Sequence, residues 1–364
     1  MDQKRTSSLH EKSGIPQPET TSKSSAKKIQ KKRGKQPSTQ EFIDGILKGS
    51  IPLLSRAITL VESTNTRHQK KANEILEACL PYANKSVRIG ITGVPGVGKS
   101  TFIEAYGKFL TGKGRKVAVL AVDPSSSVNK GSILGDKTRM EQLVTDQNAF
   151  IRPSPSGTSL GGVAQKTRES IILCEAAGFD TIIIETVGVG QSETMVHSMV
   201  DFFLLLKIAG AGDELQGIKR GIIEMADAIV INKADGENVK NTKIAKVEFN
   251  RALHLYPPKE SGWQPKVITA SALKNKGIED VQEIVDEYIQ FTQENGFFES
   301  KRSQQNKFWL LSTIEQNLRD SFFKNNEINL VLTKEFENIQ NGTSTPFSSA
   351  KKLLDLYNEK NQKR

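Results

Sequence analysis

Residues 90–101 read Gly-Ile-Thr-Gly-Val-Pro-Gly-Val-Gly-Lys-Ser-Thr and contain the full pattern G-x-x-x-x-G-K-[ST] of a phosphate-binding loop. A short β-branched run, 87–91, precedes the loop, and a stretch with helical spacing, 102–110, follows it. The motif requires this order of strand, loop and helix. The sequence therefore predicts a nucleotide-binding site at this loop.

The residue types in the loop suit the chemistry of phosphate binding. Glycines let consecutive backbone N–H groups turn toward a phosphate, and the start of the following helix adds the positive end of its dipole. Lys99 is expected to reach the β- and γ-phosphate oxygens, and the Ser100 hydroxyl is a hard oxygen ligand suited to Mg²⁺. We expect the nucleotide to contact Gly93, Val94, Pro95, Gly96, Val97, Gly98, Lys99, Ser100 and Thr101.

The segment Asn232-Lys233-Ala234-Asp235 follows an apolar run, 228–231, and predicts which base is bound. A carboxylate at Asp235 accepts from both N1–H and the exocyclic amine of guanine, whereas adenine offers no such pair of donors. After the next predicted strand, Ser271-Ala272-Leu273 is placed to offer a backbone N–H to guanine O6. The nucleotide is therefore expected to be GTP or GDP.

Further catalytic candidates lie at the ends of predicted strands. Glu185 ends the most apolar of these runs, and its carboxylate is expected to hold Mg²⁺ through water or to position the attacking water. The N–H of Gly188 is expected to contact the γ-phosphate. Asp123 ends another run, 117–122, beside the phosphates. Gln191 lies three residues past Gly188, so we do not assign it a water-orienting role.

The long segment between Lys99 and Glu185 has room for two further strand–helix units, which argues against the layout of a small GTPase with one short effector loop. Loops 123–127 and 135–140 are polar and suit ordering by a γ-phosphate and Mg²⁺. Loop 210–221 is too Gly-rich and charged to be a simple connector. We interpret it as a switch.

Alternation of apolar runs and helical patterns predicts an α/β fold, a doubly wound and mostly parallel sheet with its ligand at the carboxyl ends of the strands. The predicted strands are 87–91, 117–122, 149–152, 181–185, 201–206, 228–231 and 266–270.

Helical patterns flank this region on both sides. We divide the chain into a disordered basic tail (1–40), a helical segment (41–86), the phosphate-binding-loop domain (87–294) and a helical arm (295–364). Phe308, Trp309, Phe322 and Phe323 are expected to be exposed on the arm, which suits either packing on the main domain or a subunit interface.

The net charge is concentrated at one end of the chain. Residues 1–40 hold ten Lys or Arg against three acidic residues, which is +7 of the formal net charge of +10. This segment has no aromatic residue and almost no apolar periodicity, so we interpret it as a solvated tail, with contact to RNA or an acidic surface as the alternative. The rest of the chain does not favour nucleic acid as a partner.

Other classes of protein are not favoured. No stretch approaches the length of a membrane span, and the four histidines show no metal-ligand spacing. Cys79 and Cys174 fall in helical patterns and suggest free thiols in a reducing compartment, so a cytoplasmic location is expected.

Six runs together resemble the MeaB/ArgK family, the GTPases associated with methylmalonyl-CoA mutase, and the resemblance extends over roughly 42–300. The runs are Gly-Val-Pro-Gly-Val-Gly-Lys-Ser-Thr at 93–101, Ala-Val-Asp-Pro-Ser-Ser-Ser at 121–127, Gly-Ser-Ile-Leu-Gly-Asp-Lys-Thr-Arg-Met at 131–140, Glu-Thr-Val-Gly-Val-Gly-Gln-Ser-Glu at 185–193, Gly-Ala-Gly-Asp-Glu-Leu-Gln-Gly-Ile-Lys at 210–219 and Asn-Lys-Ala-Asp at 232–235.

The resemblance implies a homodimeric GTPase of the SIMIBI class whose carboxyl-terminal arm mediates dimerisation. It implies slow intrinsic hydrolysis, acceleration by the mutase, and a chaperone role in which GTP gates adenosylcobalamin loading and protects the mutase or a related enzyme. By matching positions it gives Asp136 a part in turnover beside Lys99, Asp123 and Glu185. It also places Asp213, Glu214, Gln216 and Lys219 in a third switch that couples the partner to hydrolysis. The alternative is a metal-delivery GTPase like those that insert nickel, although the chain has no Cys/His cluster.

Overall fold

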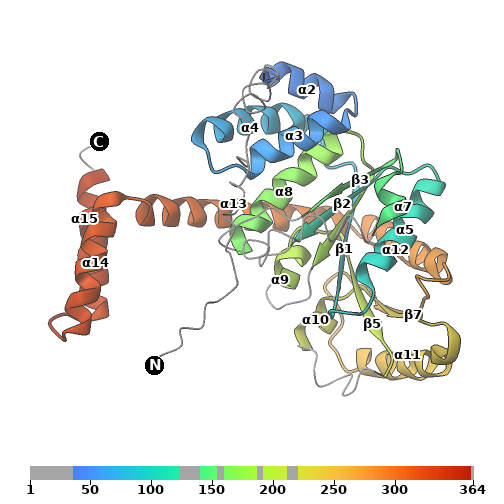
Figure 1. Ribbon diagram of the computed structural model, residues 1–364. Coiled ribbons are helices and arrows are strands. Elements are labelled where there is room, and N and C mark those ends of the chain that lie inside the picture. Colours follow the sequence, from blue (N-terminus) through green and yellow to red (C-terminus); the bar gives the residue numbers. More distant parts are fainter. Residues whose placement is uncertain (1–35, 123–139, 154–159, 187–191, 211–219, 362–364) are drawn as a thin grey trace, which may run out of the picture.

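A computed structural model describes residues 36–122, 140–153, 160–186, 192–210 and 220–361 (Figure 1). Its centre is a seven-stranded sheet in the order β3-β2-β4-β1-β5-β6-β7, and every pair of neighbours is parallel. The strands are β1 (Val87–Gly93), β2 (Val117–Val122), β3 (Ala149–Arg152), β4 (Thr181–Thr186), β5 (Phe202–Ile208), β6 (Ala228–Asn232) and β7 (Lys266–Thr269). The predicted fold class is confirmed, and each strand falls within two residues of its expected bounds.

The strands alternate side chains between two buried faces, which is why they read as continuous apolar runs. In β4, for example, Ile183 packs on one face, while Ile182 and Ile184 pack on the other. One face is covered by α5 (Lys99–Gly112), α7 (Glu141–Val144) and α12 (Ile278–Glu294), and the opposite face by α8 (Leu160–Ala176), α9 (Ser192–His197), α10 (Arg220–Met225) and α11 (Val239–Leu253).

Three amino-terminal helices form a layer over α8. They are α2 (Thr39–Leu47), α3 (Ile51–Glu62) and α4 (Thr66–Cys79), followed by the short η1 (Leu80–Tyr82). Ser38 caps α2 in a capping box with Glu41, which satisfies backbone N–H groups at the start of the helix. The layer joins the same apolar core as α8 and the sheet.

The carboxyl-terminal helices are α13 (Phe297–Phe323), α14 (Asn326–Gln340) and α15 (Pro346–Asn361). Figure 1 shows α13 running out from the body, with α14 and α15 packed at its far end. Phe308 and Phe323 are exposed as expected, whereas Phe322 is half-buried because its ring packs on Tyr357. Trp309 is 7% exposed, and its indole N–H donates to the carbonyl of Ser198. The expectation for Trp309 was therefore wrong, because this side chain docks α13 on the main domain.

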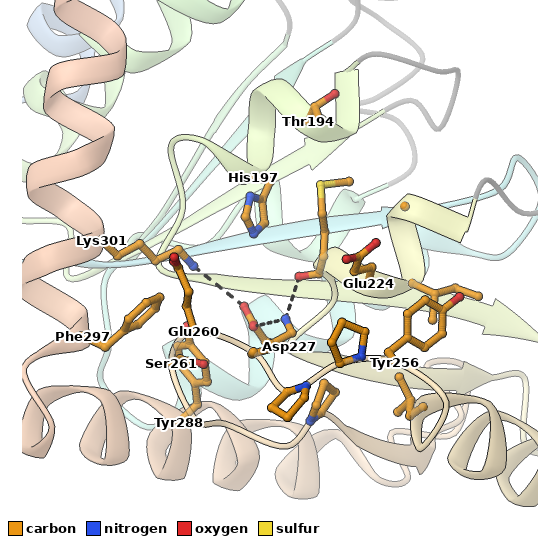
Figure 2. A pocket seen from close by; sticks show the side chains of 18 residues that line it. Thr194, His197, Glu224, Asp227, Tyr256, Glu260, Ser261, Tyr288, Phe297 and Lys301 are labelled. Carbon is orange, nitrogen blue, oxygen red and sulfur yellow. Dashed lines mark hydrogen bonds and ion pairs between the residues drawn. The ribbon is translucent and has the colours of Figure 1, made fainter.

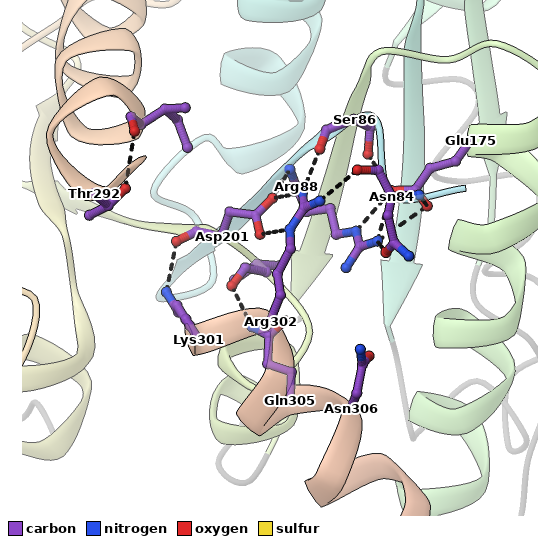
Figure 3. A network of polar contacts seen from close by, with 12 residues as sticks. Asn84, Ser86, Arg88, Glu175, Asp201, Thr292, Lys301, Arg302, Gln305 and Asn306 are labelled. Atoms are coloured by element: carbon purple, nitrogen blue, oxygen red, sulfur yellow. Dashed lines mark hydrogen bonds and ion pairs between the residues drawn. The ribbon is translucent and has the colours of Figure 1, made fainter. Parts of the chain in front are cut away.

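The first turns of α13 are fixed to the amino-terminal edge of the sheet by ionic contacts (Figure 3). The Arg302 guanidinium donates to both carboxylate oxygens of Asp201, at 2.8 and 2.7 Å, and also to the carbonyls of Asn84 and Ser86. Lys301 donates to the carbonyl of Asp201 at 2.7 Å. Asp201, just before β5, is therefore the anchor of the arm.

Behind this anchor lies a fully buried ion pair on β1. The Arg88 guanidinium donates to Glu175 of α8 through Nε at 2.9 Å, and Asn84 and Ser86 complete the contacts of that carboxylate. The Arg88 backbone N–H donates to Asp201. The network thus joins β1, α8, the start of β5 and α13.

In the part of the chain that the structure describes, we find no helix that is both long and apolar enough to cross a membrane.

Candidate nucleotide-binding site

The loop after β1 has a backbone that only glycine adopts easily. Gly96 and Gly98 have φ of +83° and +90°, and Gly93 has φ of +157°. A Cβ on Gly93 would lie 2.6 Å from the carbonyl oxygen of Leu206 on β5. The strand can therefore turn into the loop only because this position has no side chain.

Lys99, at the start of α5, closes the loop in this structure. Its ammonium donates to the carbonyl of Gly93 at 2.7 Å and to that of Val94 at 3.3 Å. Burial lowers the pKa of Lys99, while the carboxylates of Glu185 and Glu193 act in the opposite direction. The ammonium is thus held near two carboxylates at the place where the motif predicts phosphates.

Ser100 and Thr101 follow on the first turn of α5, half-buried and exposed respectively. In the loop before them, Val94 and Pro95 are exposed and Val97 is buried. The exposed surface of the loop therefore combines the apolar side chains of Val94 and Pro95 with the partly accessible Ser100 at the start of α5.

Asn232 connects the phosphate loop to the predicted base-binding segments. Its amide nitrogen donates to the carbonyl of Val97 at 2.9 Å, and its amide oxygen accepts the backbone N–H of Ala272 at 3.3 Å. Lys233 has a left-handed backbone, with φ of +58°, and donates to the carbonyl of Gly96 at 2.9 Å. Segments that are distant in sequence are thereby fixed at one edge of the sheet.

The predicted base reader, Asp235, lies beside Ser271, whose hydroxyl donates to its carboxylate. Ser271 also pairs with Lys276 across a short antiparallel bridge. Ala272 is buried, whereas Leu273 is 71% exposed. The carboxylate and the 271–273 backbone therefore lie together, as reading a guanine edge requires.

Glu185 lies at the carboxyl end of β4, next to β1, in register with Ile91. It is buried and contributes to the electrostatic environment of Lys99. One residue further, Thr186 donates to the hydroxyl of Thr92 at 2.8 Å, which ties the two strand ends together. The sequence predicted no role for Thr92 or Glu193. The polar Thr92 near the end of an apolar strand was an available signal, whereas Glu193 lies in the short helix α9 and had none of this kind.

Several predicted residues lie outside the described parts of the chain. They are Asp123, Asp136, Gly188, Asp213, Glu214, Gln216 and Lys219. Their roles therefore stay predictions, as do the assigned contacts of the described residues.

Comparison with known proteins identifies this arrangement. The profile of the family described as "Methylmalonyl Co-A mutase-associated GTPase MeaB" matches residues 54–327. The chain belongs to the MeaB family. It is similar to the GTPase ArgK of Escherichia coli K12, with 46% identity over 316 residues that cover 87% of this chain and 96% of ArgK.

A MeaB relative also occurs in an animal. The mouse protein named "Methylmalonic aciduria type A homolog, mitochondrial" is 43% identical over 332 residues, which cover 87% of this chain and 80% of the mouse protein. A crystal structure described as a LAO/AO transport system kinase has a TM-score of 0.70 and 39% identity, covering 89% of this chain and 99% of that one. The MeaB-family chain described here is thus a P-loop GTPase, an enzyme that hydrolyses GTP.

Proposed function

We propose that this MeaB-family GTPase is a chaperone of an adenosylcobalamin-dependent mutase, methylmalonyl-CoA mutase or a related enzyme. In this role, GTP hydrolysis to GDP and phosphate gates cofactor loading and protects the mutase from inactivation. The supporting observation is the family match across residues 54–327, which includes the phosphate loop, Asn232 and Asp235.

Hydrolysis in this proposal is mainly electrostatic. Lys99, released from the carbonyls of Gly93 and Val94, would bind the β- and γ-phosphate oxygens together with the loop N–H groups. Asp235, Ser271 and Ala272 would orient guanine. The enzyme therefore acts by positioning charge rather than by covalent chemistry.

The donors near the phosphate loop fit Mg²⁺. The Ser100 hydroxyl and the Glu185 carboxylate are hard oxygen groups of the kind that this cation prefers, and we propose Asp123 as a third. Mg²⁺ would neutralise charge on the β- and γ-phosphates.

We propose that the arm, residues 295–364, forms a homodimer, with 87–294 as the GTPase domain and 41–86 as a helical segment. Support comes from large apolar side chains on α13 beyond Trp309: Leu310 is 62%, Leu311 60% and Leu318 60% exposed. Exposed apolar surface of this kind marks interaction sites. A Leu311→Lys, Leu318→Lys double variant should sediment as a monomer, and a wild-type monomer would refute the proposal.

Free, buried cysteines suit a reducing compartment, and we propose the cytoplasm. Burial raises the pKa of the Cys79 thiol to about 11 and raises that of Cys174 as well. Such thiols are poor metal ligands at neutral pH, so they do not favour metal delivery.

The proposed function is tested by GTP turnover with and without purified methylmalonyl-CoA mutase. Stimulation by the mutase is expected, and Lys219→Ala should weaken the stimulation while leaving basal turnover largely unchanged. If turnover does not respond to the mutase, the GTPase activity stands but methylmalonyl-CoA mutase is rejected as the partner. An equal loss of basal turnover in Lys219→Ala would instead make Lys219 a direct catalytic residue.

A further inference from the structure

A pocket of about 560 Å³ lies at the edge of the sheet opposite the phosphate loop (Figure 2). Asp227, just before β6, forms part of its base, and Tyr288 of α12 and Lys301 of α13 line one side. His197 is the last residue of α9 and Met225 is the last residue of α10, so the carboxyl ends of both helices line the pocket. The volume suits a small organic molecule.

The base of the pocket carries two half-buried lysine side chains and one buried carboxylate. Lys259 donates to Asp227 at 2.6 Å and to the carbonyl of Met225 at 3.0 Å, while Lys301 lies 4.0 Å from the other oxygen of Asp227. Asp201 nearby is already paired with Arg302. The group Lys259, Asp227 and Lys301 therefore has a formal charge of +1, which a monoanion would neutralise.

Two hydrogen-bonding side chains at the pocket have no partner of their own among the described residues. They are the imidazole of His197, which contacts Phe203 only edge-on, and the phenol of Tyr288. Burial, together with the positive charges of Lys301 and Lys259, lowers the pKa of His197 to about 4, against the opposing effect of Asp227. Both groups are therefore neutral at pH 7 and available as donors.

The walls above this base are mainly apolar. They include Ile223, Leu253, Tyr256, Pro257 and Phe297. The acidic residues that face the pocket, Glu224 of α10 and Glu260, are exposed, so solvent screens their charges more than those of the half-buried lysines. The site thus combines a cationic, donor-rich base with apolar walls.

We propose that this pocket binds a small carboxylic acid in its ionised form, with the carboxylate at Lys259, His197 and Tyr288 and an apolar body along the walls. The third N–H of Lys259 and the unpartnered imidazole and phenol supply the donors. Charge-assisted hydrogen bonds of this kind are the strong ones, and burial strengthens them further. The proposal does not depend on the identity of the client enzyme.

The test uses hexanoate as the probe and hexanamide as its neutral match. The full-length protein, labelled in the histidine rings, is titrated at constant ionic strength, and the His197 signal is followed by NMR across pH. The chain has only four histidines, so the signal is assigned with a His197→Gln variant or by elimination with variants of the other three. Hexanoate should raise the pKa of His197 from about 4 toward about 6, because a nearby anion favours the imidazolium.

Removal of one cation should weaken binding. Lys259→Met is expected to lower the affinity for hexanoate about tenfold to a hundredfold, whereas Glu224→Gln, the matched control at the rim, should leave it unchanged or slightly higher. An unchanged His197 pKa at saturating hexanoate would overturn the proposal. Equal binding of hexanamide would overturn the carboxylate assignment. The His197 pKa and the binding of hexanamide are both measured on the wild-type protein.

Discussion

The two edges of the central sheet use charged residues in opposite ways. At the carboxyl edge, Lys99 is held by main-chain carbonyls of the phosphate loop, and a phosphate can replace these contacts. At the amino edge, Arg302 is bound to a buried carboxylate and two further carbonyls. The first arrangement leaves Lys99 available to a ligand, whereas the second uses Arg302 to hold the arm. Substitutions at the two edges should therefore separate nucleotide binding from stability.

The largest effect is expected at the amino edge. Arg302→Met leaves Asp201, which is 1% exposed, without its cationic partner, so the free energy of unfolding should fall by about 3–5 kcal/mol. GTP affinity should change less than about threefold, because the two edges are far apart. Urea unfolding and nucleotide titration measure both quantities. The control Lys307→Met, on the same helix but exposed, should stay within about 0.5 kcal/mol of wild type.

At the carboxyl edge, Lys99→Ala should have the opposite effect, with a loss of GTP affinity but not of stability. GTP affinity is expected to fall about 10²–10³-fold, because a preorganised cation at the phosphates is lost. Stability should be unchanged or higher, since burial disfavours this ammonium in the free protein. The control is Lys113→Ala at the exposed end of α5. A variant that keeps wild-type GTP turnover would refute the assignment of the site.

Base recognition should respond to Asp235→Asn. The amide replaces one acceptor with a donor, so preference for GTP over other purine nucleotides should fall about tenfold to a hundredfold, while ATP affinity changes little. Competition binding measures the preference. Glu237→Gln, exposed two residues away, is the matched control. Unchanged guanine preference in Asp235→Asn would contradict the base-reading role.

The smallest effect is expected in the pH dependence of stability, through His197 at the amino edge. His197 has a pKa of about 4 in the folded chain, below its usual value near 6.5, so the unfolded chain binds more protons between these values. Stability is therefore full above about pH 6.5 and falls as pH drops toward 4, by about 2 kcal/mol between pH 7 and pH 5. Denaturant unfolding of wild type and His197→Gln at both pH values checks this. The same loss in both proteins would assign it to other groups.

The carboxyl edge was more predictable than the amino edge, because its chemistry is carried by short contiguous motifs. The strands were also readable, since parallel strands buried on both faces are continuous apolar runs. The hydrogen bond from Asn232 to Val97 joins residues 135 positions apart. The motif predicted that Asn232 is part of the site, but it did not predict this contact. The amino edge was not predicted, because its contacts join residues from four separate segments: Arg88, Glu175, Asp201 and Arg302.

Trp309 illustrates the same limit. An amphipathic helix shows which side chains are apolar, but not which of them meets another surface of the chain, and here Trp309 meets the Ser198 carbonyl. The switch residues and the site roles stay predictions, which the variants above test.

The length of α13 would magnify any movement at its base. Its 27 residues extend roughly 40 Å, and its hydrogen bonds to the main domain, from Lys301 to Trp309, lie in the first half of the helix. A tilt of about 5° at that base would carry the tip roughly 3 Å, on the rise per residue of an ordinary helix. The base of α13 contacts Ser198 and Asp201, which lie in the α9–β5 connection. A small displacement of that connection would therefore move α14 and α15 by a larger distance.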